Sequence, residues 1–319
     1  MVQLYRKESR YDMTGSPYSI RNYLPSDFNN FVILYYTAEQ TEPVGRSITP
    51  QAILERLSRP GHTPDQDLFL VETSGTVVGF MEVEAELGIG RIIVDCWVHP
   101  EYRRKGLGRK LLNSSFKRAG QLGAGFINIS IREDNINGKN ALENLGFQYA
   151  RRYLELKLDV TKINFNEIDS PPFGCRFLRE GEEEILTQIQ NRSFAGHWGY
   201  NPNDVATTLY YIGQSHRSKK DIVLACEEDE VTGYCWTEIS GVGQGRIHMI
   251  GSDPEYRGKG IGKRLLRAGI ANLQSRGVTE ICLTVDSENE AACSLYDTIG
   301  FKMQTSYLWF EKKVEDSKS

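Results

Sequence analysis

The chain has 319 residues, of which 39% are apolar and 25% are charged, and this length and composition predict a globular protein of two ordinary domains. Its formal net charge of −4 argues against a general affinity for nucleic acid or for an anionic membrane surface. No apolar run is long enough to span a membrane, the start lacks the apolar core of a secretory signal, and the six scattered cysteines show no metal-ligand spacing. We therefore expect a cytoplasmic protein with reduced thiols and no metal.

The first half of the chain predicts the element order β-α-α-β-β-β-α-β-α-β. Ser26-Asp27 is a reasonable N-cap for the first helix, and Thr49 is one for the second. The predicted elements are a strand at 18–23, a helix from 28, a helix at 50–57, strands at 68–72, 77–84 and 92–98, a helix ending near 122, a strand at 126–131, a helix at 137–145 and a closing strand at 147–158. This order predicts an α/β fold with a mixed sheet and helices on both faces.

A glycine-rich basic segment lies between the strand that ends at Val98 and the following helix. A helix start leaves backbone N–H groups unpaired, glycines let an anionic group approach them, and the helix dipole favours negative charge. The spacing excludes a Walker loop, and it excludes a dinucleotide fingerprint because Leu111 stands where that motif needs its third glycine. The segment reads Pro100-Glu101-Tyr102-Arg103-Arg104-Lys105-Gly106-Leu107-Gly108-Arg109. It predicts an anion-binding loop of the form Arg-x-x-Gly-x-Gly.

The same segment recurs at an offset of 154 residues, from Pro100 to Pro254, within an ungapped internal repeat. The repeat also matches Asn135 with Asn289 and Gly146-Phe147 with Gly300-Phe301. A period this long indicates two similar domains, since solenoid repeats have periods of about 20–50 residues. The second copy reads Pro254-Glu255-Tyr256-Arg257-Gly258-Lys259-Gly260-Ile261-Gly262-Lys263.

A polar stretch that ends in Asp169-Ser170-Pro171-Pro172 separates the two copies, and consecutive prolines stop both helices and central strands. We therefore predict an N-terminal domain over 1–160, a linker over 161–172 and a C-terminal domain over 173–319. The second copy predicts strands at 175–178, 221–226, 232–239, 246–250, 281–285 and 301–310, and helices at 182–194, 204–212, 260–274 and 291–298.

The Arg-x-x-Gly-x-Gly loop resembles the pyrophosphate loop of the GNAT family of acetyl-CoA-dependent N-acetyltransferases, and the resemblance covers nearly the whole chain. It implies two tandem GNAT domains that use acetyl-CoA as co-substrate. It also implies that the strand before each loop is splayed from the next parallel strand and pairs its backbone with the pantetheine arm of CoA. The residues it places at CoA are Val98, Arg103, Arg104, Lys105, Gly106, Leu107, Gly108, Arg109 and Asn135 in the first copy, and Ile250, Ser252, Arg257, Gly258, Lys259, Gly260, Ile261, Gly262, Lys263 and Asn289 in the second.

The segment from Asn289 to Phe301 resembles the family pattern Asn-x-x-Ala-x-x-x-Tyr-x-x-x-Gly-Phe. The resemblance implies that Asn289 contacts the CoA arm and that the hydroxyl of Tyr296 lies near the thioester sulfur. A phenol can protonate or stabilise the thiolate that aminolysis of a thioester expels, although a half-buried helix aromatic is the other interpretation of Tyr296. The first copy has Leu142 at this position, and leucine cannot donate a proton. We therefore predict that the second copy is catalytic and that the first binds CoA or is degenerate.

The base that deprotonates an incoming ammonium is left open between His248 and Glu238 on strands of the second copy. A histidine titrates near neutral pH, but a strand histidine is as often a packed or surface residue. Arg246 stands eight residues before Pro254, where related enzymes are expected to carry an acidic base, so the acceptor is also left open. The corresponding candidates in the first copy are Glu82, Glu84 and Asp95.

The sequence thus predicts an acyl-CoA N-acyltransferase, with acetyl as the expected group and a primary amine of a small molecule as the acceptor. We expect a monomer or homodimer without nucleic-acid or membrane partners. Two alternatives are a non-catalytic acyl-CoA-binding or sensing protein and an aminoacyl transferase fed by tRNA, which predicts a basic groove. The aromatic segment 193–200, which contains His197, forms either the acceptor wall or packing under a loop.

Overall fold

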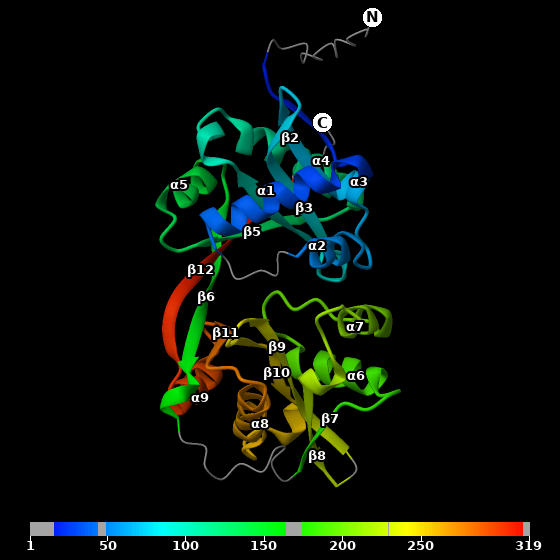
Figure 1. Cartoon of the computed structure of the whole chain (residues 1–319), viewed down its shortest axis with the longest axis vertical. Helices are drawn as coiled ribbons and strands as arrows, with labels where there is room; N and C mark the ends of the chain where they lie inside the picture. Colours follow the sequence, from blue (N-terminus) through cyan, green and yellow to red (C-terminus); the bar gives the residue numbers. More distant parts are fainter. Residues whose placement is uncertain (1–15, 44–48, 164–173, 229, 315–319) are drawn as a thin grey trace, which may run out of the picture. The chain divides into compact units, whose positions relative to one another are not determined.

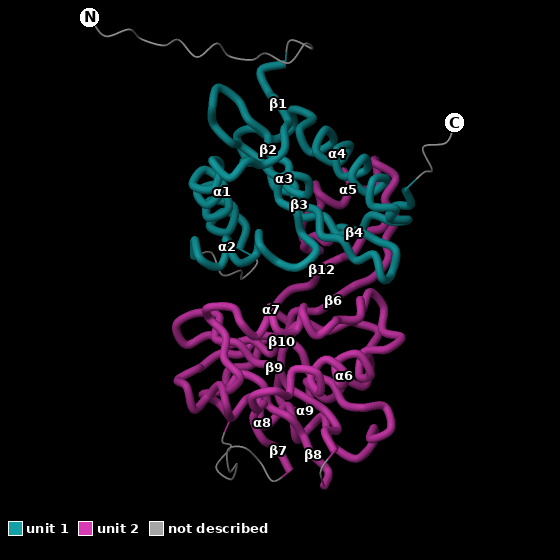
Figure 2. Tube along the Cα trace, turned by 90° about the vertical axis from the view of Figure 1, so that its right-hand side faces the viewer, with its two compact units in different colours: residues 1–129, 312–319 teal, residues 130–311 magenta. Residues whose placement is uncertain are grey.

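The structure is a computed structural model that describes residues 16–43, 49–163, 174–228 and 230–314. The chain separates into two compact units: unit 1 comprises residues 1–129 and 312–319, and unit 2 comprises residues 130–311 (Figure 2). The predicted linker over 161–172 lies mostly outside the described residues. Contacts thus divide the chain within the first sequence repeat, near residue 130.

Unit 1 is an antiparallel sheet with one parallel strand added (Figure 1). The strands β1 to β4 pair antiparallel in sequence order, and β4 pairs in parallel with the first part of β5. The elements are β1 Ser19–Asn22, α1 Phe28–Thr41, α2 Pro50–Leu57, α3 Pro64–Asp67, β2 Leu68–Thr73, β3 Thr76–Glu86, β4 Arg91–Val98, α4 Leu107–Leu122 and β5 Phe126–Arg132. Thr49 caps α2 as predicted, since its side chain accepts from the N–H of Ala52 at 3.1 Å.

An aromatic cluster fixes α1 on the sheet of unit 1. Phe31 of α1 and Phe80 of β3 are fully buried, and their ring centroids lie 5.5 Å apart in an edge-to-face arrangement. Tyr35, one turn further along α1, lies 5.7 Å from the same Phe80 ring. Such pairs contribute roughly 0.5–1.5 kcal/mol each beyond the area they bury.

Unit 2 holds a seven-stranded mixed sheet in the order β12-β6-β11-β10-β9-β8-β7. The pair β10 and β11 is parallel, and the other neighbours are antiparallel. The elements are α5 Ile136–Asn144, β6 Gln148–Asp159, β7 Cys175–Phe177, α6 Glu183–Phe194, α7 Val205–Ile212, β8 Ile222–Glu227, β9 Glu230–Gly241, β10 Gln244–Ser252, α8 Ile261–Ser275, β11 Glu280–Asp286, α9 Glu290–Ile299 and β12 Lys302–Lys313.

Strand β6 departs from the sequence prediction. The sequence assigns it to the first repeat as a closing strand, whereas the structure pairs it with β11 and β12 of the second repeat. Leu156 and Leu158 of β6 enter the same buried core as Leu283 of β11 and Phe301. Alternating apolar residues identify a strand with one buried face, but they do not select its neighbours in the sheet.

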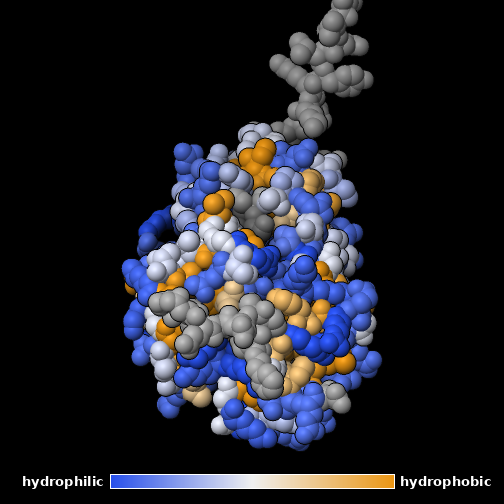
Figure 3. All heavy atoms as spheres, turned by 60° about the horizontal axis from the view of Figure 1, so that its bottom comes forward, coloured by the Kyte–Doolittle hydropathy of each residue, from blue (hydrophilic) through white to orange (hydrophobic). Residues whose placement is uncertain are grey.

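The sheet of unit 2 separates two sets of helices. The helix α8 contributes Leu265, Leu266 and Ile270 to the core cluster on one face, and Tyr296 of α9 joins them. On the other face, buried residues of α6 and α7 pack with Trp236 of β9. No helix in the described ranges is long and apolar enough to cross a membrane. On the face drawn in Figure 3, hydrophilic residues predominate and hydrophobic ones are scattered among them.

A buried carboxylate in unit 1 joins α2 to the sheet. Glu82 of β3 is 1% exposed, and its two oxygens accept hydrogen bonds from Arg56 at 2.8 Å and from Arg59 at 2.5 Å. Burial raises the pKa of Glu82, but the two guanidinium groups outweigh it and lower the pKa to about 2. Glu82 was a candidate base in the first repeat, and a carboxylate held this strongly by two cations is a weak proton acceptor.

We predict that Glu82→Gln lowers the free energy of unfolding of the protein by about 3–5 kcal/mol, because it takes the nearest counter-ion from the buried Arg59 and the half-buried Arg56. The pKa of Glu82 lies below its ordinary value of 4.5, so its stabilisation is complete above pH 4.5 and is lost as the pH falls towards 2. Urea unfolding at pH 7 and circular dichroism during acid titration measure the two effects.

The control is Glu84→Gln on the same strand, since the Glu84 side chain is 41% exposed and lies 3.9 Å from Arg59. Its loss is expected to cost less than about 1 kcal/mol. Equal urea midpoints for the two variants would contradict the structural role assigned to Glu82.

Candidate active site

The site in unit 2 begins where two parallel strands part. β10 and β11 pair only over four residues, Gln244–Ile247 with Glu280–Leu283, although β10 continues to Ser252 and β11 to Asp286. A register shift between Ile247 and Met249 in the β10–β9 pairing marks a bulge at this point. The backbone of residues 248–252 therefore has no partner strand on the β11 side. An extended ligand can add there as a strand would.

The loop after β10 presents backbone N–H groups at the start of α8. Gly258 and Gly260 have φ values of 78° and 77°, a left-handed conformation that favours glycine. The N-cap position is Gly260, which has no side chain to cap the first N–H groups of the helix. Ile261 is 3% exposed and anchors the helix start in the core. These unpaired N–H groups form an anion site at the end of a fifteen-residue helix.

The cations of this loop have no carboxylate partner among the described residues. Arg257 donates from Nη2 to the carbonyl of Ser193 at 3.3 Å, and Lys259 lies over the ring of Tyr256 at 4.4 Å. Lys263 forms no ion pair either within the described ranges. Three positive side chains thus surround the helix start without internal neutralisation, which favours a polyanion.

The loop of the first repeat, in unit 1, has the same backbone but different contacts. Gly106 has a φ of 75°, and Arg104 adopts 59° where the second repeat has Gly258. Arg103 donates from Nη1 to a carboxylate oxygen of Glu42 at 2.8 Å, and Trp97 donates from Nε1 to the other oxygen at 2.9 Å. The carboxylate of Glu42 therefore pairs with Arg103, whereas the corresponding Arg257 of the second repeat has no carboxylate partner among the described residues.

The end of α6 closes over the loop of the second repeat. Arg192 forms an ion pair with Asp253 at 2.7 Å. A Cβ at Gly251 would lie 2.7 Å from the Cβ of Ser193, so only glycine allows this approach of α6 to β10. Trp97 stands at the equivalent position of the first repeat. The pattern of the loops is shared by the two repeats, but the packing beside them is not.

The helix α9 supplies the two residues that the family resemblance singled out. Asn289 is its N-cap and accepts from the N–H of Ala292 at 3.1 Å, so this side chain has a structural role whatever it binds. Tyr296 is 6% exposed and packs against Phe301, with ring centroids 5.7 Å apart. Burial raises the pKa of Tyr296, which keeps the phenol protonated at neutral pH.

The corresponding residues of the first repeat, Asn135 and Leu142, lie in unit 2, whereas Val98 and the loop 103–109 lie in unit 1. Asn135 caps α5 by accepting from the N–H of Gly138 at 2.9 Å, and Leu142 is 5% exposed. In the first repeat, the counterpart of Asn289 is therefore a helix cap, and the counterpart of Tyr296 is a buried apolar residue.

The two candidate bases of the second repeat share one cluster on the sheet face opposite α8. Glu238 accepts from Nη2 of Arg217 at 3.0 Å, and the His248 ring lies 6.1 Å from the ring of Trp236. His248 is exposed at the bulge of β10. Desolvation and then the charges of Arg217 and Arg246 lower the pKa of His248. Because the ring is exposed, desolvation contributes less than it would for a buried ring. The lowered pKa leaves the imidazole neutral at pH 7.

The sequence did not single out Arg217 or Trp236. Arg217 reaches Glu238 across 21 residues of chain, and Arg246 reaches Glu155 of β6 across 91 residues. No local spacing encodes such contacts. The sequence signal for Trp236 was its position two residues before the candidate base Glu238.

The aromatic segment 193–200 forms a wall next to the parted strands. Phe194 stacks with Tyr200 at 5.3 Å and lies 5.3 Å from the His197 ring. Trp198 packs between Tyr153 of β6 and Trp309 of β12, at 6.2 and 5.8 Å. Desolvation and Arg257 lower the pKa of His197, while Asp286 opposes them.

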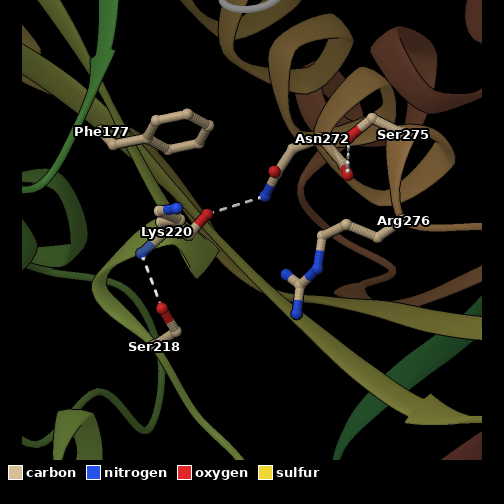
Figure 4. Close-up of a pocket in the computed structure, with 6 residues that line it drawn as sticks. All are labelled: Phe177, Ser218, Lys220, Asn272, Ser275 and Arg276. Atoms are coloured by element: carbon tan, nitrogen blue, oxygen red, sulfur yellow. Dashed lines mark hydrogen bonds between the residues drawn. The ribbon is translucent and has the colours of Figure 1, made fainter.

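A cavity of about 460 Å³ lies at the opposite end of α8 from the glycine loop (Figure 4). The helix has fifteen residues and is therefore about 20 Å long, so this cavity is remote from the parted strands. Asn272 donates across it to the carbonyl of Lys220 at 2.9 Å, and Arg276 pairs with the buried Asp221. Its polar groups hold the helix end to the sheet. Within the described ranges, no three His, Cys, Asp or Glu side chains gather as a metal site requires.

Two regions of the chain, residues 31–147 and 179–301, match the family model described as Acetyltransferase (GNAT) family. The mycothiol acetyltransferase of Amycolatopsis mediterranei (strain U-32) is 28% identical over 257 residues, which cover 76% of this chain and 83% of that protein. The mycothiol acetyltransferase of Kocuria rhizophila is 31% identical over 228 residues, which cover 66% of this chain and 72% of that protein.

Two solved structures share the fold over almost the whole chain. A GCN5-related N-acetyltransferase from Sphaerobacter thermophilus has a TM-score of 0.72 at 22% identity and covers 94% of this chain and 96% of its own. A tandem GNAT protein from the clavulanic acid biosynthesis pathway, solved without AcCoA, has a TM-score of 0.72 at 15% identity and covers 94% and 100%. The TM-scores show a common fold, and at identities this low the likeness is one of fold alone.

We predict that Gly262→Glu abolishes binding of CoA to the second loop, with a loss of at least about 100-fold in affinity, because it places a carboxylate beside the unpaired N–H groups. Isothermal titration calorimetry with CoA measures the affinity and the stoichiometry.

The matched control is Gly262→Ala. Its Cβ would lie at an ordinary 3.5 Å from Leu295, so the helix is expected to fold and to keep most of its affinity. Unchanged CoA binding in a Gly108→Glu, Gly262→Glu double variant would refute the assignment of both loops.

Proposed function

The chain belongs to the acetyltransferase (GNAT) family, and we propose that its second repeat transfers an acetyl group from acetyl-CoA to a primary amine of a small molecule. The protein is an acyltransferase, and its α/β fold with a mixed sheet consists of two tandem GNAT domains, as the sequence predicted. The observation that carries the proposal is that unit 2 combines parted parallel strands, an anion loop with uncommitted cations and a buried phenol. No second function has a comparable set of residues in its favour.

The residues of unit 2 fit acetyl-CoA in the chemistry of their donors. The N–H groups at Gly260 to Lys263 and the cations Arg257 and Lys259 suit the negatively charged pyrophosphate. The free backbone edge of Ile250 to Ser252 suits the amides of an extended pantetheine arm. Asn289, which caps α9 through its oxygen, retains its side-chain amide nitrogen as a donor.

The chemistry requires a proton to leave the acceptor and a thiolate to be stabilised. A neutral amine attacks the thioester carbonyl, and the carbon–sulfur bond then breaks with its electron pair on sulfur. Tyr296 supports the second step because its raised pKa keeps the hydroxyl protonated and able to donate a hydrogen bond to sulfur. His248 supports the first step because it is exposed, neutral and situated at the bulge where the strands part.

Glu238 is less suited to the role of base than His248. Its side chain is 14% exposed, and its two oxygens face Arg217 at 3.0 Å and His216 at 3.5 Å. The oxygens that a base would use are therefore already engaged by a buried guanidinium and a neighbouring imidazole. We therefore assign Glu238 the role of positioning Arg217.

The first repeat lacks counterparts of three of these features. Leu142 replaces the phenol, Glu82 is held by two arginines, and Glu42 neutralises the loop cation Arg103. Binding of a pyrophosphate at the first loop has to displace Glu42 or to accept its repulsion. These contacts support transfer by the second repeat and weak CoA binding by the first.

We predict that Tyr296→Phe lowers kcat by roughly one to four orders of magnitude, the range expected for a lost general acid, with nearly constant affinity for acetyl-CoA. Thiol release from acetyl-CoA measures turnover, screened first against small amines, amino acids, aminoglycosides and cysteinyl compounds. Calorimetry measures the affinity.

Gly108→Glu in the first loop is the control and should leave most of the turnover intact. If Tyr296→Phe turns over at the wild-type rate while Gly108→Glu is inactive, the first repeat is the working one and the assignment is reversed.

A further expected outcome concerns Glu42. In a Gly262→Glu background, where only the first loop remains, Glu42→Gln should raise its affinity for CoA by about 3- to 10-fold, because it frees Arg103 and removes a negative charge. Calorimetry at low salt measures this gain.

Glu101→Gln removes the same charge near the same loop, whereas the ion pair of Arg103 is with Glu42. It should leave the affinity nearly unchanged. Equal gains in both variants would show a general charge effect instead of release of Arg103.

A further inference from the structure

Several buried polar atoms on the sheet face opposite α8 have no hydrogen-bond partner in the described part of the chain. The side chain of Arg217 is 7% exposed and Trp236 is 3% exposed, yet Nη1 of the first and Nε1 of the second are both unpartnered. The same holds for the hydroxyls of Tyr234 and Ser193. Buried donors without acceptors are costly, and in native proteins they commonly await a ligand or an ordered water.

The two nitrogen donors belong to one stacked pair. The guanidinium carbon of Arg217 lies 5.3 Å from the centre of the Trp236 ring. The other nitrogens of Arg217 are in use, since Nη2 donates to Glu238 at 3.0 Å and Nε lies 3.4 Å from Nε2 of His216. The arginine is therefore fixed on one side and retains one donor on the other.

A second arginine stands on the neighbouring strand. Arg246 of β10 is the cross-strand partner of Glu238, and its side chain is 22% exposed. It donates to Glu155 at 3.1 Å and to the hydroxyl of Thr284 at 3.2 Å. Desolvation and then the charges of Arg217, Arg246 and His216 lower the pKa of His248, whose ring lies 6.1 Å from that of Trp236. The two arginines therefore lie near the imidazole.

We propose that Arg217, Arg246 and Trp236 form a subsite for a carboxylate of the acceptor, so that the acceptor is an amine that also carries a carboxylate. The inference rests on the proposed function, which it makes more specific. A carboxylate has two planar oxygens with about four lone-pair positions, and guanidinium and indole N–H groups are donors only. A cationic or purely apolar group leaves those donors unpaired.

The same subsite couples recognition to proton transfer. A bound carboxylate offsets the positive charges around His248, which moves the pKa of the imidazole back towards its ordinary value. The ring then accepts a proton from the acceptor ammonium more readily. The neighbours that face the ring enter this balance as well: Glu238 and Glu155 are already paired with the two arginines, and His216 lies beside Glu238.

Matched acceptors test the proposal in the full-length protein. Glycine and β-alanine are compared with glycinamide and β-alaninamide by thiol release from acetyl-CoA. The amines of the amides are less basic, so a larger fraction of them is unprotonated at neutral pH. A lower rate with the amides therefore cannot be explained by a shortage of free amine. We expect the carboxylates to have the higher kcat/KM. We expect Arg246→Gln to lower kcat/KM for the carboxylates by about 10- to 100-fold more than for the amides.

Two further variants separate recognition from folding. Arg246→Lys should retain part of the preference, since it keeps the charge but loses the planar fork. Arg246→Gln combined with Glu155→Gln removes both partners of the existing ion pair and should still lack the preference. Equal use of carboxylates and amides by the wild-type protein, or an equal loss for both in Arg246→Gln, overturns the proposal.

A binding measurement keeps the proposal separate from catalysis. The chain has four tryptophans, and the indole N–H resonance of Trp236 is assigned by its loss in Trp236→Phe. Propionate should shift this resonance in a saturable way, propionamide should not, and Arg217→Lys should weaken the response. If propionate binds but no amine is acetylated, the subsite stands and the proposed function fails. If amines are acetylated without preference and propionate has no effect, the proposed function stands and the subsite fails.

Discussion

The parting of β10 from β11 is the constraint on which the rest of the site depends. Four paired residues hold the two parallel strands together, and beyond Ile247 the bulge turns β10 away. The backbone groups that this exposes have no partner strand on the β11 side, so an extended ligand can pair with them. The loop glycines and the start of α8 follow directly from the end of β10. The anion site is therefore placed at one end of the exposed edge.

The two repeats show how much a duplicated backbone can retain while its chemistry diverges. The positive φ of Gly106 and Gly260 is common to both loops, because the backbone turn demands it. Side chains around the turn are under no such demand. On the strand before the loop, the first repeat has Trp97, which pairs with Glu42. The second repeat has Gly251 at that position, and the end of α6 packs against it. Fold similarity to other proteins consequently says little about which repeat acts.

Electrostatics distinguishes the two faces of the sheet in unit 2. The face under α8 and α9 is mostly apolar, and burial there raises the pKa of Tyr296 and keeps its phenol protonated. The opposite face carries paired charges and an exposed imidazole, so protons can be exchanged with an acceptor there. The proposed mechanism thus gives donation to sulfur and removal of a proton from nitrogen to residues whose environments shift their pKa values in opposite directions.

The sequence by itself determined the local structure and the repeated motif. The cap at Thr49, the bounds of α2, the end of α4 and the glycine loops follow from signals within a few residues of each other, which act in any tertiary context. The sequence also showed that Leu142 stands where the second repeat has Tyr296, because the two repeats can be compared position by position without gaps. Only the tertiary structure decided that β6 lies between β11 and β12, that Glu42 reaches Arg103 and that Arg217 stacks on Trp236. Those contacts join segments far apart in the chain, and their energies depend on burial and on the pairing of donors with acceptors, which no sequence spacing records.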